Sequence, residues 1–102
     1  MATLLVLYNQ PTDPTAFDAH YTQTHIPLAK QIPGLRSYTI STGPIMDTDG
    51  PSPYYLIAEL TFDSLVDRQA AAGSAEGQAA GADLANFAQA GVTFAMYDAR
   101  AA

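Results

Sequence analysis

Four stretches of the chain carry the hydrophobic pattern of β-strands. Residues 3–8 form a continuous apolar run, which is typical of a strand buried on both faces. Residues 35–42, 54–62 and 92–98 show the alternation that places every second side chain on one face. Because apolar or aromatic residues occur on both faces, we predict four strands whose two faces are both buried against other parts of the structure.

A helix is predicted between the first two strands, from Asp13 to about Gln31. Asp13 can accept hydrogen bonds from free backbone N–H groups, and Pro14 fits the first helical position. Pro27 cannot donate a backbone hydrogen bond, so we expect a kink or a broken last turn beside His25. The residues that share one inward stripe, at steps of four, four, three and four, are Phe17, Tyr21, His25, Leu28 and Ile32.

A second helical region, rich in alanine, is predicted between the third and fourth strands. Asp63 or Ser64 can cap its start, and glycine recurs at positions 73, 77 and 81. Within a helix each glycine costs about 1 kcal/mol relative to alanine. We therefore predict two or three shorter helices rather than one long one.

The order of these elements (strand, helix, strand, strand, helices, strand) predicts an α+β fold. The simplest arrangement is a ferredoxin-like βαββαβ sandwich, a single domain over residues 1–102 with a four-stranded antiparallel sheet. The helices of such a domain cover only one face of the sheet. Since the strands are apolar on both faces, we expect two sheets to pack back to back in a symmetric homodimer.

The composition supports a covered second face and excludes two classes of partner. Charged residues make up 14% of the chain, against roughly 25% in average proteins. With a net charge of −6 and four scattered cations, we expect neither nucleic acid nor a membrane surface as a partner. The absence of cysteine, of a signal pattern and of a membrane-spanning run favours the cytoplasm.

His25 is the first candidate for chemistry. It points inward among apolar residues, beside the helix break expected at Pro27. In such a pocket an imidazole can act as an acid, a base or a hydrogen-bond donor near neutral pH. The alternative is a core histidine bonded to a backbone carbonyl. Asp98, on the fourth predicted strand, is a candidate partner for its imidazole.

Three tyrosines are candidate ligand contacts: Tyr8 ends the first strand, Tyr21 lies on the inward helix stripe and Tyr38 is on the second strand. A phenol offers a flat apolar wall with one hydrogen-bonding tip, which suits a small aromatic or oxygenated compound. The alternative is that these side chains only pack, with their hydroxyls in water. We expect a small hydrophobic organic ligand between the sheet and the first helix.

No metal site is predicted. His20 and His25 are five residues apart, about 140° around a regular helix, and so cannot bind one ion together. The run Asp47-Thr48-Asp49-Gly50, in the long loop 43–53, lacks the rest of a calcium loop and is interpreted as a solvated turn. Glu59, in the third strand, is expected to form a structural ion pair with Arg36, and the alternative is a catalytic acid.

Several motifs spread over most of the chain occur together. They are Tyr8 with Pro11, Asp13 and Phe17, then Tyr21 followed by His25-Ile26-Pro27-Leu28, then Pro33-Gly34-Leu35-Arg36, and the late segments 74–78 and 83–87. In this combination the chain resembles the EthD family, named for an accessory gene of bacterial ethyl tert-butyl ether degradation. The resemblance implies a homodimer that forms a dimeric α+β barrel, with His25 as the main site residue, Tyr8 as a second one and no cofactor.

These features lead us to expect a small cytoplasmic catabolic protein of EthD type. It would be a cofactor-independent enzyme for oxygenation, isomerisation or lyase chemistry on a small apolar or aromatic oxygenated compound. His25 would be the general acid or base, with Tyr8 and Tyr38 orienting the ligand. The alternative is a non-catalytic accessory protein that binds a hydrophobic intermediate or delivers it to a partner oxygenase in ether degradation. A third hypothesis is haem binding through His25.

Overall fold

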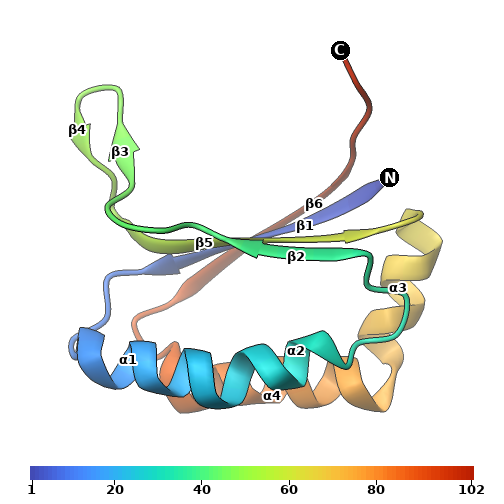
Figure 1. Ribbon diagram of the computed structural model, residues 1–102, viewed down its shortest axis with the longest axis horizontal. Coiled ribbons are helices and arrows are strands. Elements are labelled where there is room, and N and C mark those ends of the chain that lie inside the picture. Colours follow the sequence, from blue (N-terminus) through green and yellow to red (C-terminus); the bar gives the residue numbers. More distant parts are fainter.

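The computed structural model describes residues 1–102, and its main sheet has the predicted strands (Figure 1). These are β1 (Ala2–Asn9), β2 (Ser37–Ile40), β5 (Tyr54–Phe62) and β6 (Val92–Asp98). They lie in the order β2-β5-β1-β6, and each neighbouring pair is antiparallel. The predicted α+β fold with a four-stranded antiparallel sheet is confirmed.

The helices lie on one face of this sheet, as the prediction requires, and leave the opposite face uncovered (Figure 1). The first helical stretch consists of α1 (Pro14–His20), a π-helical segment (Tyr21–His25) and α2 (Ile26–Lys30). Two helices, α3 (Leu65–Gly73) and α4 (Ala75–Phe87), precede the last strand. None of the helices has the length and apolar character that a membrane span requires.

Short polar side chains begin the helices. Asp13 accepts a hydrogen bond from the backbone N–H of Ala16 at 3.1 Å, and Ser64 accepts one from that of Asp67 at 3.1 Å, as predicted. Ser74 separates α3 from α4, which the sequence interpretation missed. The alanine-rich region therefore forms two helices, and α4 runs unbroken through the glycines at 77 and 81. A Cβ atom at Gly77 would lie 2.0 Å from the carbonyl oxygen of Ala71, so glycine permits the close approach of α4 to α3.

The hydrophobic core lies between the sheet and the helices. Alternate residues of the two central strands point into it because of the period of two. Burial of each large side chain contributes roughly 1.5–3 kcal/mol. The members of the core from the sheet are Ala2, Leu4, Val6, Tyr8, Ala58, Leu60 and Phe62, and those from the helices are Phe17, Tyr21, Ala71 and Phe87.

The long loop between β2 and β5 contains a small hairpin of β3 (Met46–Asp47) and β4 (Gly50–Pro51), which stands away from the main sheet (Figure 1). Three of these four residues are exposed, and the turn between the two strands is exposed as well, in agreement with the predicted solvated turn. The chain contains no group of three or more His, Asp or Glu residues placed to hold a metal ion.

The predicted ion pair between Arg36 and Glu59 is wrong. In the antiparallel register Glu59 lies opposite Thr39. Arg36 lies three residues before Thr39, next to the end of β5, and is therefore too far away to pair with Glu59. There the guanidinium of Arg36 donates to both carboxylate oxygens of Asp63, at 3.0 and 2.6 Å. Glu59 is an exposed residue on the uncovered face of the sheet.

Candidate functional site

Two histidines of the first helical stretch reach the same carboxylate because the helix widens between them. Within the π-helical segment the N–H of Ile26 donates to the carbonyl of Tyr21, five residues earlier. This bonding pattern brings residues five apart close to one line along the helix. The prediction that His20 and His25 diverge assumed a regular helix and is wrong for this segment.

Asp83 of α4 is the carboxylate at which they meet. Its Oδ1 atom accepts hydrogen bonds from Nε2 of His20 at 2.9 Å and from Nδ2 of Asn86 at 3.0 Å. Its Oδ2 atom accepts one from Nδ1 of His25 at 3.0 Å. Asp83 is 5% exposed and His25 is 6% exposed. The buried carboxylate is thus held by three donors, two from the first helical stretch and one from its own helix.

These bonds fix which nitrogen of His25 carries the proton. An ionised carboxylate can only accept hydrogen bonds, so a neutral His25 bonded to it carries its hydrogen on Nδ1. The Nε2 atom then has a free lone pair and makes no hydrogen bond within the protein. Many hydrolases use the same arrangement, in which an aspartate fixes the tautomer and orientation of a histidine that acts as the general base.

The surroundings keep the imidazole neutral and the carboxylate ionised. Burial lowers the pKa of His25 from its usual 6.5, and the hydrogen bond to Asp83 opposes this only in part. Its ring lies 4.7 Å from that of Phe87 and 5.3 Å from that of Tyr21, centroid to centroid. Burial acts to raise the pKa of Asp83, but hydrogen bonds from Asn86, His20 and His25 outweigh it and hold that pKa below its usual value.

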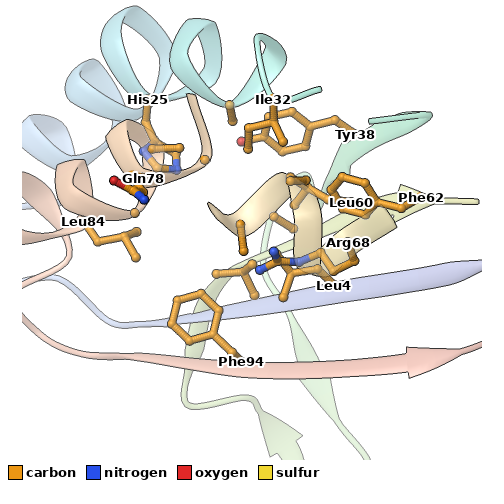
Figure 2. Close-up of a pocket in the computed structure, with 18 of the residues that line it drawn as sticks. Leu4, His25, Ile32, Tyr38, Leu60, Phe62, Arg68, Gln78, Leu84 and Phe94 are labelled. Atoms are coloured by element: carbon orange, nitrogen blue, oxygen red, sulfur yellow. The ribbon is translucent and has the colours of Figure 1, made fainter. Parts of the chain in front are cut away.

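His25 lines a cavity of about 380 Å³ between the helices and the sheet (Figure 2). Its size falls within the range of ligand pockets, and 15 of its 20 lining residues are hydrophobic, which suits an apolar ligand. Phe94 of the edge strand β6 also lines it and is 51% exposed. The polar side chains around the cavity are Tyr8, His25, Tyr38, Arg68 and Gln78.

The candidate tyrosines occupy two positions relative to this cavity. Tyr8 and Tyr38 line it, whereas Tyr21 is not among its lining residues. The hydroxyls of Tyr21 and Tyr38 are hydrogen-bonded to each other at 2.6 Å, so Tyr21 contacts a residue of the cavity wall without lining the cavity itself. Burial is the main cause that raises the pKa of all three phenols, which therefore remain neutral at physiological pH.

Asp83, the orienting residue, was not among the predicted site residues, and the proposed partner Asp98 is wrong. Asp98 is exposed and lies opposite Ala2 at the end of β6, whereas the imidazole of His25 bonds to Asp83 in the helix layer. A signal for Asp83 is present in the sequence, because Ala80 and Phe87, three residues before and four after it, lie on the same helix stripe. Both of them are buried, as is Asp83.

A family model described as EthD domain matches residues 9–91. The chain belongs to the EthD family. This EthD protein is 43% identical over 98 residues to an uncharacterized 11.0 kDa protein of Rhodococcus erythropolis, located in the thcB-thcC intergenic region, with 96% of this chain and 94% of the relative covered. The crystal structure of an EthD family protein from Bacillus halodurans C-125 is similar with a TM-score of 0.90 and 37% identity, over 98% of this chain and 99% of that one.

More distant solved structures share the fold of the EthD protein. SnoaB, a cofactor-independent oxygenase from Streptomyces nogalater, is similar with a TM-score of 0.67 at 14% identity, over 99% of this chain and 94% of that one. A dimeric protein of unknown function and ferredoxin-like fold from Bacteroides fragilis has a TM-score of 0.64 at 20% identity, over 95% of this chain and 94% of that one. The predicted ferredoxin-like class is thereby confirmed.

The neutral state of His25 predicts that the EthD protein loses stability on mild acidification. Its folded pKa lies below the usual 6.5, so between these two values the unfolded chain binds the proton more tightly. The free energy of unfolding should therefore fall as the pH drops below about 6.5 and should stop responding to His25 below its folded pKa. Urea unfolding at pH 7.5 and 5.5 measures the difference, which should shrink in the His25→Gln variant. An equal pH dependence in both proteins would contradict the prediction.

Proposed function

We propose that this EthD protein is a small catabolic protein that binds an apolar or aromatic oxygenated compound in the cavity and acts on it without a cofactor. The observation that carries the proposal is the geometry of His25, whose Nδ1 is bonded to Asp83 while the ring lines the cavity. We propose the cytoplasm as its location, since the chain has no cysteine and does not need an oxidising compartment.

His25 acts as the general base in this proposal. Its Nε2 atom takes a proton from an acidic C–H or O–H group of the ligand, and the ionised Asp83 stabilises the imidazolium that forms. Oxygenation without a cofactor, isomerisation and lyase reactions can all begin with such a proton transfer. SnoaB, which shares the fold at low identity, is described as a cofactor-independent oxygenase, and this supports chemistry of that kind.

The tyrosines orient the ligand in this proposal. Tyr38 donates a hydrogen bond to a ligand oxygen, and the 2.6 Å bond between its hydroxyl and that of Tyr21 positions it. Tyr8 contributes a wall of the cavity from the central strand. Because the pKa of each phenol is raised by burial, each remains a hydrogen-bond donor rather than an anion.

A second candidate is an accessory protein that binds a hydrophobic intermediate and delivers it to a partner oxygenase, as in ether degradation. The predominance of hydrophobic residues around the cavity favours it, since such walls bind apolar compounds whether or not a reaction follows. Binding without turnover, with activity gained only when an oxygenase is added, would distinguish this function from the first.

Catalysis by His25 is tested with purified protein and a panel of small aromatic and ether-type compounds, followed for turnover and for exchange of ligand hydrogen with D₂O. For a compound that reacts, His25→Gln should lower kcat at least about a hundredfold. Asp83→Asn should lower it as well, because the amide no longer fixes the tautomer. Tyr54→Phe, outside the cavity, serves as the control. Unchanged turnover in a folded His25→Gln variant would refute the role of His25.

We also propose that the protein is a homodimer joined through the uncovered sheet face. This face carries Leu5, Leu7, Ile57 and Tyr97, which share one side of the sheet by strand register. Apolar area of this kind on a chain with few charges is typical of an interface. Similar structures from Bacteroides fragilis and Thermobifida fusca are described as dimeric, which supports the proposal.

Sedimentation at micromolar concentration should therefore give a dimer for the wild-type chain. Leu7→Lys places a charge in the proposed interface and should yield a folded monomer. Val66→Lys, at an exposed position of α3 on the helix side, should leave the dimer intact. A monomeric wild-type protein, or a Leu7→Lys variant that dimerises as before, would contradict the proposed interface.

A further inference from the structure

Arg68 is the cationic side chain that lines the cavity. It belongs to α3, and Figure 2 shows its guanidinium reaching into the cavity between the helices and the sheet. The other three Lys and Arg residues of the chain do not line it, and no Asp or Glu does. In a protein with a net charge of −6, the cavity thus carries one formal charge, which is positive.

This guanidinium has no hydrogen-bonding partner within the chain. Its Nε atom is buried and makes no hydrogen bond. The three ion pairs of the chain involve other residues, and Arg36 shows the contrast, since it donates to both oxygens of Asp63. Buried donors of native proteins are almost always bonded, and an unsatisfied one is destabilising. The buried Nε–H of Arg68 therefore lacks a partner within the polypeptide, and a ligand in the cavity could supply one.

The packing of Arg68 holds the group in place for such a partner. The central carbon of the guanidinium lies 5.7 Å from the ring centroid of Phe62, a distance typical of a cation–π contact. Contact with an aromatic face leaves the N–H groups at the edge of the guanidinium plane free to donate. Burial lowers the pKa of Arg68 from its usual 12.5, yet an arginine remains charged at physiological pH.

We propose that Arg68 binds a carboxylate of the ligand, so that the cavity takes a small apolar or aromatic carboxylic acid. The planar fork of N–H groups matches the two oxygens of a carboxylate, and the mainly hydrophobic lining of the cavity strengthens charge-assisted bonds. The apolar body of the acid then lies against the hydrophobic walls of the cavity, which His25 of the π-helical segment and Tyr38 of β2 also line (Figure 2). This inference rests on the proposed function, because it assumes that the cavity is the ligand site.

The test compares 1-naphthoate with the neutral, nearly isosteric 1-naphthamide by isothermal titration calorimetry at pH 7.5. The wild-type protein should bind the naphthoate at least about tenfold more tightly, as expected for a charge-assisted bond. Arg68→Met keeps apolar volume and removes the charge, so it should bind both probes equally and retain its affinity for the amide. Arg68→Lys should keep part of the preference. The matched control Arg36→Gln removes a surface arginine and should keep all of it.

The outcomes separate this inference from the proposed function. Equal binding of both probes by the wild-type protein, or an Arg68→Met variant that still prefers the naphthoate, overturns the role of Arg68 and leaves the cavity as a ligand site. Failure of the wild-type protein to bind either probe contradicts both. A preference that depends on Arg68, together with turnover that survives His25→Gln, supports the carboxylate site and refutes only the proposed catalysis. Circular dichroism confirms that each variant is folded.

Discussion

The buried carboxylate of Asp83 is the constraint on which the candidate site depends. It accepts hydrogen bonds from His20 and His25 on the first helical stretch and from Asn86 on its own helix. A buried polar group that loses its hydrogen-bond partner typically costs about 1–3 kcal/mol, and a charged group costs more. The two histidines reach one carboxylate because the helix widens between them, so this shared contact depends on the π-helical segment. Pro27, which lacks an N–H, follows directly where the helix returns to α geometry.

The same carboxylate accounts for the chemistry that we assign to the cavity. A buried imidazole without a partner would be neutral, but its tautomer would be free to change. Asp83 keeps the hydrogen on Nδ1 and leaves the lone pair of Nε2 free, while the rings of Tyr21 and Phe87 pack against the imidazole. Polar groups around the cavity are few, and three of them have distinct proposed roles. The imidazole is the base, the phenol of Tyr38 donates a hydrogen bond, and the guanidinium of Arg68 binds an anion.

How far the sequence predicts this structure depends on the range of the interactions involved. The strands, the helix caps at Asp13 and Ser64 and the inward position of His25 follow from local periodicity and capping, and these were predictable. The partner of Arg36 depends on strand register, which a single sequence does not define, and the prediction therefore chose Glu59 instead of Asp63. Asp83 was missed because its role arises only when α4 packs against the first helical stretch. Arg68 appeared in the sequence as one scattered cation, and only the packing of α3 brings it to the cavity.

The protonation of the two ring nitrogens of His25 is the most direct measure of the central claim, that Asp83 holds His25 as a neutral base facing the cavity. Nitrogen-15 NMR of the labelled protein at pH 7.5 distinguishes a protonated from an unprotonated imidazole nitrogen. We predict that Nδ1 carries the hydrogen and Nε2 does not, and that Asp83→Asn abolishes this preference. A neutral ring with its hydrogen on Nε2, or a doubly protonated ring at this pH, would contradict the claim.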